Sequence, residues 1–106
     1  MPLTRSFKET LAARAKRDRA FRKALLTEGV NLLVEGDLQT AKGVLRDYIN
    51  ATIGFDALSD AVDIPPKSLM RMFSTDGNPT ASNLLVVLAH LQHAEGVSLK
   101  VRVSAA

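Results

Sequence analysis

Directly after Pro66, which we include in the candidate site, Lys67, Ser68 and Arg71 form a short polar set whose residue types suit contact with nucleic acid. Residues three and four apart share one face of a helix, so in a helical segment Arg71 lies beside Lys67 and Ser68. An ammonium, a hydroxyl and a guanidinium can each bond phosphate or base edges, and Arg or Lys on guanine is the commonest specific contact. We therefore predict DNA contact at these four positions. The alternative is an ordinary solvated helix face.

Asn78, Thr80, Ser82 and Asn83 form a second polar set, in and after the sequence TDGNPT. The Asp-Gly and Asn-Pro dipeptides indicate a turn, and Thr80 can cap the helix that follows it. The amino terminus of a helix attracts phosphate through its unpaired N–H groups. All four residues are therefore candidate DNA-binding residues. A purely structural role in the turn and the cap is the alternative for Asn78 and Thr80.

Two short predicted helices must position the first polar set. Apolar residues recur at helical spacing on both sides of residues 63–65: Leu58, Ala61 and Val62, then Leu69, Met72 and Phe73. Neither segment is long enough for a stable isolated helix, so each must bury its apolar stripe. Pro65 and Pro66 disfavour helical geometry in the residues before them, and Pro66 suits the first helical position. This pattern predicts a helix-turn-helix whose second helix can enter a DNA major groove.

The rest of the sequence is also predicted to be mostly helical. Ser6, Asp18 and Asp37 are candidate amino-terminal caps, and Gly36 and Gly54 are candidate helix ends. After Thr80, four leucines are expected to form one apolar face: Leu84, Leu85, Leu88 and Leu91. The expected fold is mainly α, with five to six helices in a single domain over residues 1–106. Residues 1–53 would hold the amino-terminal helices, and residues 54–94 would hold the lambda-repressor-like helix-turn-helix core.

The segment VSLKVRV, residues 97–103, alternates between apolar and polar residues. Val97, Leu99, Val101 and Val103 would share one face, as in a short C-terminal β-strand. The sequence predicts no other strand in the chain. The strand would therefore pair with its copy in a second subunit, which predicts a homodimer.

Composition and charge narrow the classes of protein and partner. The chain has 106 residues, 46% of them hydrophobic, and no cysteine, which indicates one globular domain without disulfides or thiolate metal sites. No apolar run can span a membrane, and the first residues lack a signal-peptide pattern, so we expect a cytoplasmic protein. Residues 1–24 carry eight basic and two acidic residues. This basic segment predicts an anionic partner, either DNA or an acidic protein, and a solvated helix face is the alternative.

A set of residues over about positions 7 to 103 is shared with a known family. The residues are Asp18, Phe21, Glu35-Gly36-Asp37, Leu45-Arg46-Asp47, Leu58, the turn at Asp63-Ile64, Ser68-Leu69, Ser74 and Gly77-Asn78-Pro79-Thr80 with the leucine helix after it. In these positions the chain resembles the HigA-like addiction-module antidote proteins, bacterial antitoxins of the lambda-repressor-like class. It departs from them at Ser59, Asp63, Pro65 and Met70, where the family more often has alanine, glycine, serine and tyrosine. The link HAEGVSLKV into the last strand is also longer than usual.

The resemblance implies a transcriptional regulator that represses its own operon and neutralises a small RelE-like toxin. Two other functions stay open: a stand-alone or phage-derived repressor, and a protein-interaction module without DNA binding. No catalytic arrangement is recognisable, so we do not expect an enzyme or a cofactor. His90 and His93 lie one helical turn apart, but without further ligands they do not predict a metal site.

Overall fold

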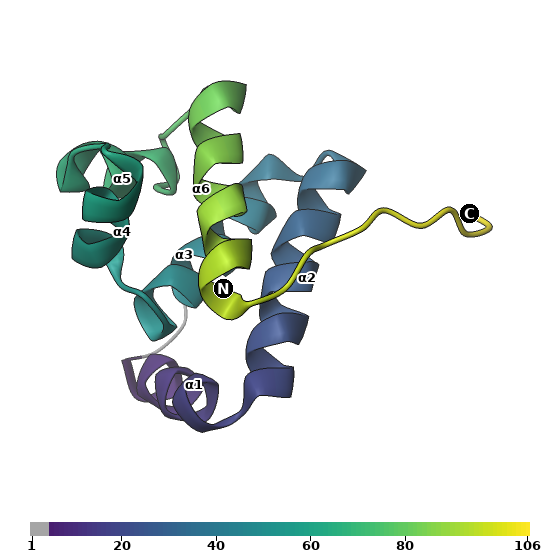
Figure 1. Cartoon of the computed structure of the whole chain (residues 1–106), viewed down its shortest axis with the longest axis horizontal. Coiled ribbons are helices and arrows are strands. Elements are labelled where there is room, and N and C mark those ends of the chain that lie inside the picture. Colours follow the sequence, from purple (N-terminus) through teal and green to yellow (C-terminus); the bar gives the residue numbers. More distant parts are fainter. Residues whose placement is uncertain (1–4) are drawn as a thin grey trace.

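A computed structural model describes residues 5–106, and in that range the chain forms six α-helices and no β-strand. The helices are α1 (Arg5–Arg17), α2 (Arg19–Glu35), α3 (Leu38–Ala51), α4 (Phe55–Val62), α5 (Pro66–Met72) and α6 (Ala81–Glu95). Residues 1–4, the start of the predicted amino-terminal region 1–53, lie outside the described residues. The prediction of a mainly helical protein with five to six helices is confirmed (Figure 1).

Polar residues at the helix ends define most of the boundaries. Asp18 accepts a hydrogen bond from the Phe21 N–H, and Asp37 accepts one from the Thr40 N–H, so both predicted caps are confirmed. Gly36 ends α2 in the left-handed conformation, at φ 89°, which favours glycine. Two details differ from the sequence prediction. Ser6 lies inside α1 instead of capping it, and α3 already ends at Ala51, so that Gly54 immediately precedes α4.

The core joins α2, α3 and the carboxyl-terminal helices. Its largest fully buried apolar side chains are Leu26 of α2, Leu45 and Ile49 of α3, Leu58 of α4, Leu69 and Phe73 in and after α5, and Val87 and Leu91 of α6. The short helices α4 and α5 each bury one apolar stripe in this core, because a helix of seven or eight residues gains its stability from packing. Ile64, in the turn between them, packs against the same core.

The apolar face of α6 differs from the prediction at one residue. Leu88 and Leu91 are buried and Leu84 packs against the core, but Leu85 is 63% exposed. Val87 is fully buried in its place. The helix is apolar on more than one side, so the spacing of its leucines alone does not identify the buried face.

The C-terminal segment does not form the predicted strand within the single chain. Val97 and Leu99 pack against the core, and the Leu99 N–H donates to Gln92 Oε1 over 2.8 Å. Beyond them Val101 and Val103 are 84% and 95% exposed, and the chain extends past α2 (Figure 1). A strand requires a second backbone to bond, and the described residues offer none beside this segment. The predicted strand over 97–103 is therefore absent from the monomer.

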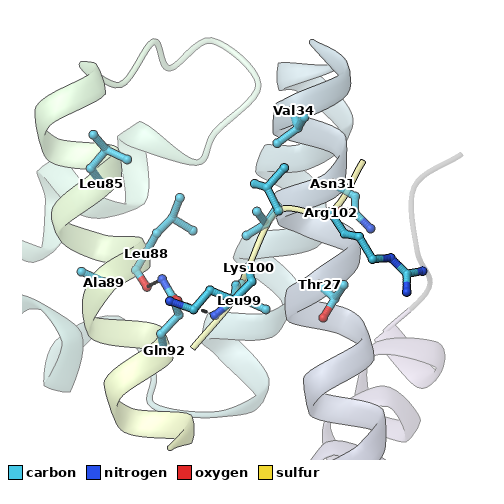
Figure 2. A pocket seen from close by; sticks show the side chains of 12 residues that line it. Thr27, Asn31, Val34, Leu85, Leu88, Ala89, Gln92, Leu99, Lys100 and Arg102 are labelled. Atoms are coloured by element: carbon cyan, nitrogen blue, oxygen red, sulfur yellow. Dashed lines mark hydrogen bonds between the residues drawn. The ribbon is translucent and has the colours of Figure 1, made fainter. Parts of the chain in front are cut away.

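The C-terminal segment crosses an open pocket between α2 and α6 (Figure 2). The pocket has a volume of about 500 Å³, and Val34 of α2 faces it from one side and Leu85 of α6 from the other. Both side chains are exposed, as is the neighbouring Val101. No helix of the described residues is long and apolar enough to cross a membrane.

Candidate nucleic-acid interface

The turn between α4 and α5 is held by two hydrogen bonds that involve Ser59, one as acceptor and one as donor. The Ser59 carbonyl accepts from the Asp63 N–H over 2.9 Å, and its buried hydroxyl donates to the Ile64 carbonyl over 2.6 Å. Asp63 takes the left-handed conformation at φ 57° and ψ 44°, which aspartate tolerates better than most residues. These contacts fix the direction in which the chain enters α5.

The residues of α5 divide into a buried side and an exposed side. Leu69 and Met72 are buried, whereas the four predicted contact residues are all exposed: Pro66, Lys67, Ser68 and Arg71. Pro66 occupies the first helical position, as the sequence predicted, and the Leu69 N–H closes the first turn on the Pro65 carbonyl. No described residue forms a hydrogen bond or ion pair with the Lys67, Ser68 or Arg71 side chain. Their polar groups are therefore free to bind a ligand.

The second predicted set lies at the amino end of α6. Asn78, Thr80, Ser82 and Asn83 are all exposed. Thr80 Oγ1 accepts the Asn83 N–H over 3.1 Å, so the structural role predicted for Thr80 as a helix cap is confirmed. The side chains of Asn78, Ser82 and Asn83 have no polar partner within residues 5–106. They can donate hydrogen bonds to a phosphate beside the first turn of α6.

The two sets share one end of the molecule. Figure 1 shows α5 and the amino end of α6 at that end, and α1 at the opposite end. The structure therefore separates the basic segment of α1 and early α2 from the predicted contact residues. Part of the positive charge of this basic segment is also neutralised within the protein, because Arg14 pairs with Asp18 at 3.5 Å. The Arg14 guanidinium also stacks over the Phe21 ring, 4.5 Å from its centroid.

Side chains of α3 hold the loop that connects the two sets. Gln39 Nε2 donates to the Thr75 carbonyl, Lys42 Nζ donates to the Thr75 and Gly77 carbonyls, and the Arg46 guanidinium donates to the Phe73 carbonyl. The sequence interpretation did not identify these roles of α3, or the role of Ser59. One signal was present for Lys42: it falls at the helical spacing of Leu45 and Ile49, on the side of α3 that the core covers.

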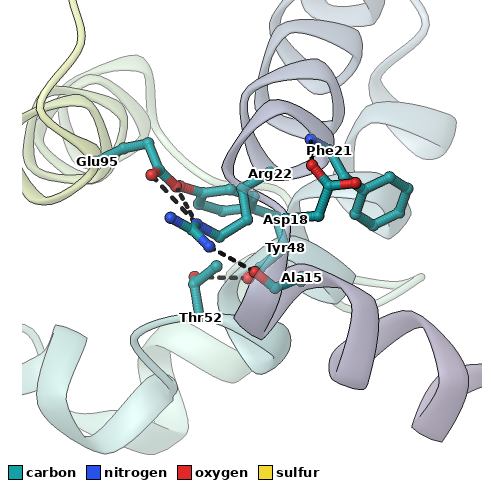
Figure 3. Close-up of polar contacts among 7 residues, drawn as sticks. All are labelled: Ala15, Asp18, Phe21, Arg22, Tyr48, Thr52 and Glu95. Atoms are coloured by element: carbon teal, nitrogen blue, oxygen red, sulfur yellow. Dashed lines mark hydrogen bonds and ion pairs between the residues drawn. The ribbon is translucent and has the colours of Figure 1, made fainter.

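A separate polar network joins α1, α2, α3 and α6 (Figure 3). Arg22 Nε donates to both carboxylate oxygens of Glu95, at 3.1 and 3.2 Å, and Arg22 also donates to the Ala15 carbonyl. The Tyr48 hydroxyl donates to Glu95 Oε1 over 2.7 Å. Burial alone raises the pKa of Glu95, but the hydrogen bonds from Tyr48 and Arg22 outweigh it and hold the pKa below its usual value. Burial and the adjacent Glu95 raise the pKa of Tyr48.

This network serves the fold. Arg22 Nε and the Tyr48 hydroxyl both bond Glu95, and Arg22 Nη1 bonds the Ala15 carbonyl, so these bonds connect the helices to one another. The region described also contains no group of three histidine, aspartate or glutamate side chains able to hold a metal ion.

No protein-family model, curated protein or solved structure matches the chain. The candidate interface consists of the exposed side of α5 together with the amino end of α6.

Proposed function

We propose that the chain is a DNA-binding transcriptional regulator of the helix-turn-helix class. One observation carries the proposal: α5 buries Leu69 and Met72 and leaves Lys67, Ser68 and Arg71 exposed, with no side-chain hydrogen bond or ion pair to residues 5–106. The three-residue connection from α4 and its Ser59 bonds support α5 as a rigid recognition helix. A recognition helix of this kind lies in the major groove, with residues near its amino end against the base edges.

In this proposal the two polar sets have different tasks. Arg71 and Lys67 reach base edges, where a bidentate arginine discriminates guanine from other bases. Ser68 and the amino end of α6 contact the sugar–phosphate backbone, which fixes the register of the protein on the duplex. Phosphate contacts release counterions, so affinity for DNA should fall steeply as salt rises.

We further propose that the regulator is a bacterial, cytoplasmic antitoxin that represses its own operon and neutralises a RelE-like toxin. The support for this step is the resemblance to the HigA-like antidote proteins, centred on Gly77-Asn78-Pro79-Thr80 and the turn at Asp63-Ile64. A stand-alone repressor would have the same DNA-binding residues and no toxin partner. Co-purification of the chain with the product of the adjacent small gene separates the two functions.

We propose that the regulator acts as a homodimer through residues 97–103. Apart from Leu99, whose N–H bonds Gln92, residues 98–106 have no backbone hydrogen bond to any described part of the chain. Their free edge and the exposed Val101 and Val103 support antiparallel pairing with a second copy. A twofold dimer would also present two recognition helices to a palindromic operator.

Fluorescence anisotropy tests the DNA-binding function. The protein is titrated onto the duplex upstream of its own gene and onto a scrambled duplex, each at several salt concentrations. Tight binding to its own duplex alone, weakened by salt, is the expected result. Equal and weak binding to both duplexes would contradict sequence-specific regulation and favour the protein-interaction module. Expression of the neighbouring gene alone then tests the antitoxin role, which is wrong if that gene is harmless.

A further inference from the structure

Lys42 is a buried cation that donates to two uncharged backbone carbonyls. It lies in α3, its side chain is only 2% exposed, and its ammonium donates to the Thr75 carbonyl over 3.2 Å and to the Gly77 carbonyl over 2.6 Å. Within the described chain no carboxylate forms an ion pair with it. Burial of a charge is costly unless hydrogen bonds compensate. A neutral side chain could fill this space at lower cost, so the distinguishing property of Lys42 is its two directed bonds.

The two carbonyls belong to the loop between α5 and α6. Gln39 and Arg46, on the same side of α3, bond the loop at Thr75 and Phe73. The three donors therefore hold alternate carbonyls, those of residues 73, 75 and 77. This loop leaves the carboxyl end of α5 and leads to the cap of α6 at Thr80.

The loop also packs against α5 itself. A Cβ atom added at Gly77 would lie only 1.7 Å from the Arg71 carbonyl oxygen, so the two backbones are in close contact. Ser74 bonds the same carbonyl through its hydroxyl and its N–H. The bonds from α3 fix the inner side of this loop, and its outer side carries the exposed Asn78 and Thr80.

We propose that Lys42 is a positioning residue for DNA recognition. Its bonds to Thr75 and Gly77 set the place of Asn78, Thr80 and the amino end of α6 relative to α5, although Lys42 itself touches no DNA. The inference rests on the proposed DNA-binding function. It adds that the specificity of the exposed interface depends on a buried lysine on a different helix.

The test compares the variant Lys42→Met with the wild-type protein. Methionine is similar in length and apolar, but it cannot donate to the carbonyls. The control is Lys23→Met, which removes the same charge from an exposed position of α2. Hydrogen exchange of the loop amides is measured without DNA, and anisotropy measures the affinity for the protein's own upstream duplex and for a scrambled duplex.

The expected result has two parts. In Lys42→Met the Gly77 N–H, which bonds the Ser74 carbonyl, exchanges at least about tenfold faster, while amides in the centre of α2 keep their rates. Because the amino end of α6 fixes the register of α5 on the duplex, affinity for the specific duplex falls at least about tenfold, and affinity for the scrambled duplex falls less. Lys23→Met retains the loop protection and the preference for the specific duplex.

Two results would overturn the inference. One is that the loop amides of Lys42→Met exchange at the wild-type rate. The other is that they exchange faster while the variant binds the specific duplex with wild-type affinity. Failure of the proposed function itself looks different, because the wild-type protein would then fail to distinguish the two duplexes. If Lys42→Met does not fold, Lys42→Gln is used instead, a polar side chain that is one atom shorter than lysine and cannot keep both bonds to the loop. The same two losses in smaller measure are expected for Lys42→Gln, and their absence overturns the inference.

Discussion

The Tyr48 hydroxyl donates a 2.7 Å hydrogen bond to Glu95 Oε1, which joins α3 to the last residue of α6. Arg22 of α2 bonds the same carboxylate and also the last turns of α1 through the Ala15 carbonyl. One carboxylate thus links the amino-terminal helices to the end of the helix that begins at the candidate interface. The Glu95 side chain is 6% exposed, so this link is protected from water.

Replacement of Glu95 by alanine should destabilise the protein. The change leaves the partly buried Arg22 and the Tyr48 hydroxyl without their acceptor, and breaking a buried pair in this way costs about 3 kcal/mol. Urea denaturation measures the loss in the free energy of unfolding. The control is Glu28→Ala, an exposed residue of α2, which should change stability by less than about 0.5 kcal/mol. Equal effects of the two changes would show that the network contributes nothing.

The free energy of unfolding should depend on pH through the Glu95 carboxylate. The pKa of Glu95 is lower in the folded protein than in the unfolded chain, where it is about 4.3. Its contribution is therefore complete above the unfolded pKa and is lost as pH falls through the folded pKa. Compared with Glu95→Gln, the wild-type protein should lose more stability as pH falls below about 5. A constant difference in unfolding free energy over that range would contradict this assignment.

Gly77 and Gly43 should respond to alanine in opposite directions. The Cβ atom at residue 77 would collide with the Arg71 carbonyl, and the backbone shift this requires should cost about 1–3 kcal/mol. At Gly43, inside α3, the nearest atom is Arg46 Nη2 at 3.9 Å, so alanine fits. It should stabilise the helix by about 0.5–1 kcal/mol. Thermal denaturation of both variants checks the two signs, and a stabilising Gly77→Ala would refute the close contact.

Arg71→Ala should weaken binding to the specific duplex by about 1–3 kcal/mol if Arg71 reads a base. The loss should be much smaller on a scrambled duplex, because it concerns a base contact. Arg17→Ala removes the same charge from an exposed position of α1, the helix at the opposite end of the molecule in Figure 1, and is the matched control. Anisotropy with both duplexes separates the outcomes. Equal losses for Arg71→Ala and Arg17→Ala would indicate a diffuse charge effect in place of a specific contact.

The sequence predicted local structure well because local rules determine it. The caps Asp18, Asp37 and Thr80 act within three residues of themselves, and Pro66 starts a helix by its own fixed geometry. The burial of Leu69 and the exposure of Arg71 likewise follow from helical spacing, given that one side of α5 meets the core.

The features that the sequence did not predict depend on tertiary contacts. Nothing in the local pattern around Lys42 identifies the Thr75 and Gly77 carbonyls as its partners, which lie more than thirty residues away. Leu85 is exposed because α2 and the C-terminal segment leave an open pocket beside it. The missing strand has the same origin, since alternation predicts a strand's faces but supplies no partner for its backbone.

The C-terminal segment yields the last prediction, which concerns assembly. If residues 97–103 pair across a twofold axis, Val101 and Val103 become buried, and each buried valine contributes about 1.5–2 kcal/mol. The double variant Val101→Asp and Val103→Asp should therefore raise the dissociation constant of the dimer by well over tenfold, since about 1.4 kcal/mol corresponds to each factor of ten. Light scattering during gel filtration at several protein concentrations measures the oligomeric state. The variant Lys100→Ser and Arg102→Ser changes the other face of the same segment and should remain dimeric. A wild-type protein that is monomeric at every concentration would refute strand pairing.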